Sequence, residues 1–235
     1  MTKTTLLQLM SVMTLVMVIT LGQTNDVFAD PTIRLTQGIN FVEISDQGVD
    51  DTNNNTGIVQ YTQGIGVFDN VLAATSTSNL NATNPSLNTA IIVQSTAGGN
   101  LTYAFSDGNF TGTDLTCVNF GGGTTDGDVT HTVYVDSSNG LFATTTPIFS
   151  TTSFPDGQIL IDKSANATGS SLYSLTIVSE IAHNIDTDRT SFSIITSCDG
   201  EETPTWNATT DSNPQGDIDA PVDNPVDTVN IIADA

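Results

Sequence analysis

Apolar and polar residues alternate with a period of two along most of this chain, which is the pattern of half-buried β-strands. Between residues 130 and 135, His131 falls on one face with Val133 and Val135. Between residues 172 and 181, a longer face is shared by Tyr173, Leu175, Ile177, Ser179 and Ile181. Further runs of this kind cover residues 33–35, 41–44, 58–61, 65–72, 90–94, 101–105 and 192–197. The pattern predicts many short strands.

Clusters of glycine, asparagine and aspartate separate these runs, and such clusters are typical of turns. They lie at residues 36–38, 98–100, 107–109, 121–123, 138–140 and 155–157. No amphipathic helix of ten or more residues is expected after residue 29, and no fixed-period repeat is visible. We therefore predict an all-β fold, an antiparallel β-sandwich of jelly-roll-like type.

The first 29 residues have the form of a signal peptide. Lys3 precedes an apolar run over residues 6–21, and Val27-Phe28-Ala29 supplies a cleavage site before Asp30. The alternative is an uncleaved membrane anchor, but the run is interrupted by polar residues and is shorter than the roughly 20 residues of a clean span. We expect a secreted or cell-surface protein whose mature chain is not inserted in a membrane.

The remainder divides at Cys198. Residues 30–198 form the expected β-sandwich domain. Residues 199–235 carry nine acidic residues, no basic ones and four prolines, which predicts a flexible, disordered acidic tail. Its aliphatic residues could instead add an edge strand or dock on a partner; they are Val226, Val229, Ile231 and Ile232.

The net charge is −22, from 4 Lys and Arg against 26 Asp and Glu. Such a surface repels phosphate backbones and anionic membranes, so nucleic acid is not an expected partner. Divalent cations are plausible counterions.

Two cysteines, Cys117 and Cys198, lie 81 positions apart in the sequence. In an exported chain, an even number of cysteines predicts a disulfide, here worth about 3–4 kcal/mol in the chain-entropy model. Two free thiols are the alternative.

The polar stretch SDQGVDDTNNNTG, residues 45–57, is a candidate calcium loop. Calcium takes six to eight oxygen ligands, and this stretch offers Asp46, Asp50, Asp51, Asn53 and Asn55. Its spacing is not that of an EF-hand. The alternative is a solvated hairpin loop, because aspartate, asparagine and glycine are common turn formers. A second acidic loop covers residues 125–128.

Six N-x-S/T sequons are candidate glycosylation sites whose use depends on the source organism. They are Asn54, Asn81, Asn100, Asn109, Asn166 and Asn207.

The two histidines, His131 and His183, stand in no catalytic motif: G-x-S-x-G, HExxH and Cys-His patterns are all missing from the sequence. We expect both to be sheet residues, facing solvent or hydrogen-bonded at a strand end, and we expect no enzymatic activity.

Four segments, FVEISDQGVDDTNNNTGIVQY (41–61), LTYAFSDGNF (101–110), VTHTVYVDSSNGLFATT (129–145) and YSLTIVSEIAH (173–183), occur together in this order. The set resembles exported β-sandwich proteins associated with the PEP-CTERM sorting signal. The resemblance implies an exported surface or matrix protein. This chain lacks the C-terminal sorting signal itself.

Together these features favour a structural or adhesive protein of the cell surface or extracellular matrix, with extracellular polysaccharide or other surface proteins as partners. A calcium-assisted carbohydrate-binding module is the alternative, and a secreted hydrolase is third. Sugar binding uses exposed aromatic rings, and aromatic residues make up only 6% of the chain.

Overall fold

The computed structural model describes residues 31–77, 84–185 and 187–199, and no helix occurs in these ranges. Accordingly, no segment of this described part is a helix that could cross a membrane. The predicted signal peptide and the acidic tail beyond Asp199 lie outside them. The strands are β1 (Thr32–Gln37), β2 (Asn40–Ser45), β3 (Ile58–Tyr61), β4 (Phe68–Thr77), β5 (Ser86–Ser95), β6 (Gly99–Thr125), β7 (Asp128–Asp136), β8 (Thr146–Ser150), β9 (Gly157–His183) and β10 (Arg189–Asp199).

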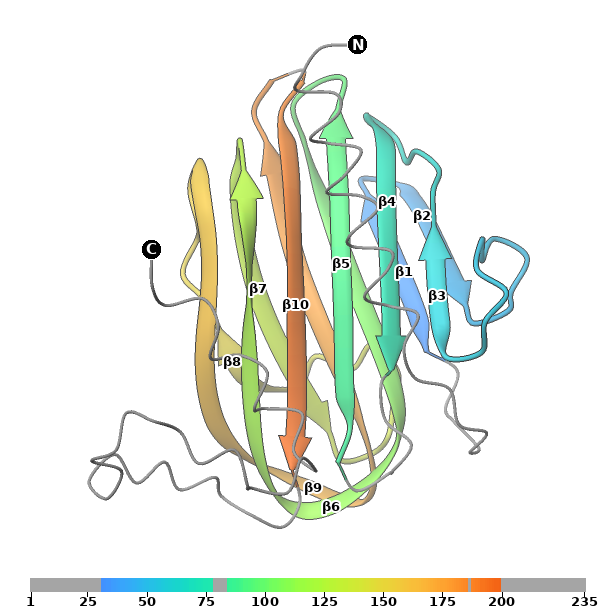
Figure 1. The fold of residues 1–235 in the computed structure, drawn as a ribbon, viewed down its shortest axis with the longest axis vertical. Coiled ribbons are helices and arrows are strands. Elements are labelled where there is room, and N and C mark those ends of the chain that lie inside the picture. Colours follow the sequence, from blue (N-terminus) through green and yellow to red (C-terminus); the bar gives the residue numbers. More distant parts are fainter. Residues whose placement is uncertain (1–30, 78–83, 186, 200–235) are drawn as a thin grey trace, which may run out of the picture. The chain divides into compact units, whose positions relative to one another are not determined.

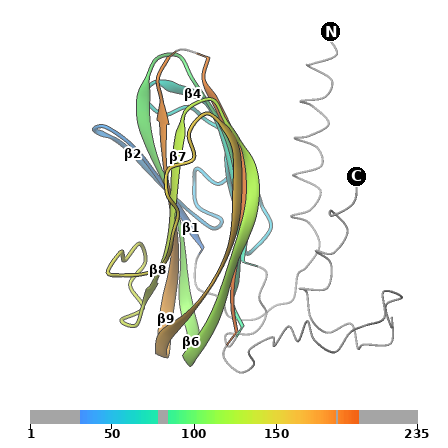
Figure 2. The same cartoon turned by 90° about the vertical axis from the view of Figure 1, so that its left-hand side faces the viewer.

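Antiparallel pairing connects the ten strands continuously, and the sheet folds over on itself into two layers (Figures 1 and 2). Sheet I has the order β2-β1-β6-β9-β7-β8. Sheet II has the order β3-β4-β5-β10-β6-β9 and lies in front in Figure 1. This arrangement confirms the predicted antiparallel β-sandwich.

The strands β6 and β9 belong to both sheets, because each is 27 residues long and bends midway. Residues 99–107 of β6 lie in sheet I, and residues 112–125 lie in sheet II. Between them the β6–β9 register shifts at Phe110, where Asn109 has a φ of 61°. The cluster at 107–109, predicted as a turn, is therefore a bend inside one strand. Asp107 holds this bend by accepting bonds from Thr77 Oγ1 (2.6 Å) and Gly108 N (2.8 Å).

The inner faces of the two sheets form one hydrophobic core. As the alternation predicts, Val133, Val135 and the apolar face of β9 point inward. Three of the four tyrosines, Tyr61, Tyr103 and Tyr173, are also buried, whereas Tyr134 is half-buried. Tyr103 in sheet I shares a hydrogen bond with Thr89 in sheet II, so a polar contact also joins the layers.

The glycine triplet 121–123, predicted as a turn, lies instead inside the C-terminal part of β6. On the inner face, Gly121 stands between Ile194 of β10 and Ile161 of β9, and Gly123 stands between Phe192 and Ile159. An added Cβ atom would lie 2.2 Å from Ser193 O at Gly121 and 2.0 Å from Ser191 O at Gly123, so the close approach of the β10 backbone requires glycine at both positions. The triplet is therefore a packing feature, and the prediction of a turn there was wrong.

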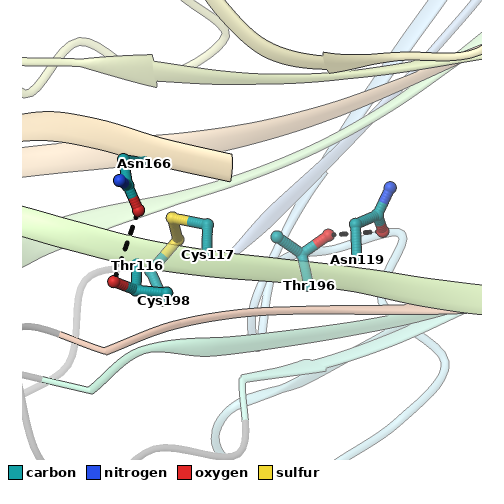
Figure 3. Close-up of a disulfide and its surroundings, with 6 residues drawn as sticks. All are labelled: Thr116, Cys117, Asn119, Asn166, Thr196 and Cys198. Carbon is teal, nitrogen blue, oxygen red and sulfur yellow. Dashed lines mark hydrogen bonds between the residues drawn. A yellow bond between two sulfur atoms is a disulfide. The ribbon is translucent and has the colours of Figure 1, made fainter. Parts of the chain in front are cut away.

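The disulfide Cys117–Cys198 is formed, as predicted, between directly opposed residues of β6 and β10 (Figure 3). The two Cα atoms are 4.0 Å apart, and both side chains are fully buried. The next inward pair along the strands is also linked, because Thr196 Oγ1 donates to Asn119 Oδ1 at 3.1 Å. The end of β10 is thus fastened to the middle of β6.

Candidate functional site

An open groove of about 350 Å³ crosses three neighbouring strands of sheet I on its outer face. Two transverse rows of residues build it. One row is Asn100–Ala182–Asp128, and the other is Thr102–Glu180–Thr130, taken in the strand order β6-β9-β7. The backbone of Leu101 and Ile181 completes the lining, since their side chains point into the core.

The groove is hollow because the middle position of its first row is an alanine. Ala182 lies between Asn100 and Asp128, so a methyl group separates two longer polar side chains. The wall carries an amide, two hydroxyls and two carboxylates, which together provide both hydrogen-bond donors and acceptors. Such a shallow polar surface suits a ligand rich in hydroxyl groups.

An aromatic ring stands to one side of the groove on the same face. Phe41 of β2 pairs with Thr36 of β1, which pairs with Thr102 of the groove, so the ring is two strand spacings, about 10 Å, from the groove. Figure 2 shows this β1–β2 hairpin leaning out on the side of sheet I. Phe41 is 57% exposed. The Arg34 guanidinium lies 5.5 Å from its centroid and forms an ion pair with Glu43.

The chain's similarity to known proteins is weak. No protein-family model and no curated protein matches it. Among solved structures, a mutant family 29 carbohydrate-binding module aligns at a TM-score of 0.24 and 8% identity, over 72% of this chain and 87% of that one. A family 61 module in complex with β-1,4-galactotriose aligns at a TM-score of 0.21 and 8% identity, over 72% of this chain and 88% of that one. Scores this low carry no argument, and the resemblance to PEP-CTERM-associated proteins stays a prediction.

The candidate calcium loop connects β2 to β3, and two of its acidic side chains, Asp46 and Asp51, accept hydrogen bonds from backbone N–H groups of the loop and of β3. Asp51 accepts bonds from the N–H groups of Gln47, Asn53 and Gln60, each at 2.9 Å. Asp46 accepts one from Gly57 N at 2.8 Å. Across the described ranges, no group of three or more His, Cys, Asp or Glu side chains is placed to hold a metal ion.

Calcium binding by Asp46, Asp50, Asp51, Asn53 and Asn55 therefore stays a prediction. These hydrogen bonds do not involve the Asp50 carboxylate, so its removal is the change that would test calcium without opening the loop.

The sequons differ in what a glycan would displace. Asn54 and Asn166 are exposed. Asn100 lines the groove, so a glycan there would fill it. Asn109 is linked to Asn139 by two bonds of 2.7 and 2.8 Å, through its backbone N–H and its Oδ1, and neither bond uses the Nδ2 atom that would carry a glycan. Asn81 and Asn207 lie outside the described residues.

Both histidines are interior residues bonded to hydroxyl groups. His183, at the end of β9, contacts Ser95 Oγ and Thr190 Oγ1 at 2.9 Å each. His131 contacts Ser179 Oγ at 3.1 Å and is fully buried, so the expectation that it might face solvent was wrong. Its alternation with Val133 and Val135 already indicated the core face.

Burial gives His131 a measurable effect on stability. Desolvation lowers its pKa to about 4, against 6.5 in the unfolded chain. As the pH falls through 6.5, His131 becomes protonated in the unfolded chain while it stays neutral in the folded protein. The free energy of unfolding therefore has its full value above pH 6.5 and decreases progressively toward pH 4.

We expect unfolding free energy to fall by about 1 kcal/mol between pH 6 and pH 5 from this group alone. Urea titrations of wild type and His131→Leu at both pH values check it. Because His183 and all carboxylates remain in the variant, the contribution of His131 is the difference between the two proteins in how much unfolding free energy each loses from pH 6 to pH 5. Equal losses in wild type and variant would show that the attribution to His131 is wrong.

Proposed function

We propose that this chain is an exported, non-catalytic module of the cell surface or extracellular matrix that holds polysaccharide in the groove of sheet I. The observation that carries the proposal is the groove itself, open and lined with amide, hydroxyl and carboxylate groups. These are the groups that bind sugar hydroxyls, and an exposed ring, Phe41, lies on the same face for stacking against a sugar.

The setting of the groove supports binding by a preformed surface. All five polar side chains come from the strands β6, β7 and β9, and two of these strands continue into sheet II. A site on paired strands needs little ordering when the ligand arrives, which lowers the cost of association. The disulfide suits an oxidising environment outside the cell.

A non-catalytic role agrees with the position of the histidines. Both rings are buried, and the hydrogen bonds of their nitrogens go to serine and threonine hydroxyls. A hydrolase would need an acid–base group in contact with its substrate. Asp128 and Glu180 are the acid–base groups that line the groove itself, so an assay for polysaccharide cleavage tests whether they act catalytically.

Filling the groove is expected to abolish retention on polysaccharide. Ala182→Leu places a larger side chain at the centre of the first row while leaving every polar group in place. Retention of the mature chain would be measured by affinity electrophoresis through a panel of neutral, acidic and amine-bearing polysaccharides. We expect at least one polysaccharide of the panel to retard wild type. For the variant, we expect the affinity calculated from the retardation to be at least about tenfold lower.

Thr124→Leu is the matched control, because it adds an exposed leucine to the sheet II part of β6. Retention should survive there. Wild type that passes every gel unretarded, or equal retention by Ala182→Leu, would contradict the groove proposal. Release of soluble oligosaccharide from any member of the panel would contradict the non-catalytic part.

A further inference from the structure

The two carboxylates of the groove face no cation. The described cations are Arg34, Lys163 and Arg189. Lys163 and Arg189 lie in sheet II. Arg34 shares the outer face of sheet I, but its charge is paired with Glu43 at 2.8 Å, and its guanidinium carbon stacks 3.8 Å from the centroid of Phe142. Within the described residues, neither groove carboxylate forms an ion pair, so no cation in direct contact neutralises their charges.

The carboxylates also retain free acceptor atoms. Ser153 Oγ donates to Asp128 Oδ1 at 3.1 Å, and Thr130 Oγ1 donates to Glu180 Oε2 at 3.3 Å. Among the described residues, no hydrogen bond reaches the second oxygen of either group. These two hydrogen bonds orient the carboxylates and leave one oxygen atom on each for a ligand.

The geometry points to a ligand that carries a protonated amine: we propose that the groove binds an amino sugar without its N-acetyl group. Asp128 and Glu180 are diagonal neighbours on β7 and β9, because Glu180 lies opposite Thr130. Such neighbours are roughly 7 Å apart. One ammonium group between them, over the methyl of Ala182, can donate to both.

Charge decides between ligand classes. A uronic acid or sulfated sugar would meet repulsion from Asp128 and Glu180. The hydroxyls of a neutral sugar can donate to these carboxylates, but neutral donors replace the lost hydration of a charged group less fully than charged donors do. A protonated amine offsets that loss through charge-assisted hydrogen bonds. Asn100 and Thr102 on the opposite wall then remain for the sugar hydroxyls.

This inference rests on the proposed function, and the experiment separates the two. Titration calorimetry of the mature chain would use three trisaccharide probes, a β-1,4-linked glucosamine trimer, its fully N-acetylated form and a β-1,4-linked glucose trimer. EDTA and 0.15 M salt are present, so bridging metal ions are removed and long-range attraction is screened. We expect the glucosamine trimer to bind at least about tenfold more tightly than either other probe.

Isosteric variants locate the charge. Asp128→Asn and Glu180→Gln should each weaken binding of the glucosamine trimer by about tenfold or more. A chain of net charge −22 attracts any polycation, so a charge control is essential. The double variant Asp114→Asn, Asp162→Asn removes two exposed carboxylates from sheet II and should leave the affinity within about twofold.

Each result decides a separate point. Equal affinity for the acetylated or the glucose trimer overturns the amine inference and leaves the groove as a polysaccharide site. Equal weakening by the groove variants and the control also overturns it, since the attraction is then the field of the whole protein. Failure of wild type to bind any of the three trimers overturns the amine inference, and the proposed function falls with it if the polysaccharide panel also shows no retention.

Discussion

Loss of the Cys117–Cys198 bond is expected to lower the free energy of unfolding by about 4 kcal/mol. The bond closes a loop of 81 residues, so removing it releases a large amount of conformational freedom in the unfolded chain. For a domain of this size, the melting temperature should fall by roughly 10 °C. Urea and thermal unfolding of the Cys117→Ala, Cys198→Ala double variant measure the effect.

Reduced wild type is the control for packing, because it keeps both cysteine side chains and lacks only the covalent bond. Both residues are fully buried, so the chain has to be reduced while unfolded and then refolded with reductant present. A similar loss in the reduced chain and in the double variant attributes the effect to the cross-link. If oxidised and reduced wild type unfold at the same urea concentration, the bond contributes no stability.

Gly123→Ala is expected to cost about 3 kcal/mol or more through overpacking. A Cβ atom at this position would lie 2.0 Å from Ser191 O and 2.6 Å from Phe192 Cα. Both are backbone atoms of β10, which is hydrogen-bonded between β5 and β6 and cannot move aside without breaking the pairing. The urea midpoint of the oxidised variant measures the cost.

Gly122→Ala is the matched control in the same strand. Its added Cβ would meet only Ile159 O, at 3.0 Å, so we expect a loss of less than about 1 kcal/mol. Equal losses for the two alanine variants would mean that the effect is a general one of glycine in a strand, and the packing explanation for the triplet would be discarded.

The groove shows why a site on a sheet is difficult to find from sequence. Asn100 was noted only as a sequon and as part of a predicted turn, and Asp128 only as part of an acidic loop. Thr102, Thr130 and Glu180 drew no attention, because polar residues fill the outward positions of every strand. The pairing of β7 with β9, and of β9 with β6, brings these five residues together.

The sequence by itself determined the fold class, the strand faces and the partner cysteines. Alternation with a period of two is a local property, so β7 and the C-terminal half of β9 could be assigned together with their inward residues. The same pattern placed His131 with Val133 and Val135, and its burial could have been predicted from it. With only two cysteines in the chain, one disulfide was possible.

Only the tertiary structure decided which strands belong to both sheets and which structural role the glycine clusters have in those strands. The clusters at 107–109 and 121–123 have the composition of turns, yet one is a bend and the other a strand interior, because β6 continues through both sheets. Gly121 and Gly123 are required by the close approach of β10, about 70 positions away, where an added Cβ atom would meet Ser193 O and Ser191 O. Contacts of that range depend on pairing and layer packing, which no local pattern encodes, and the groove depends on them in the same way.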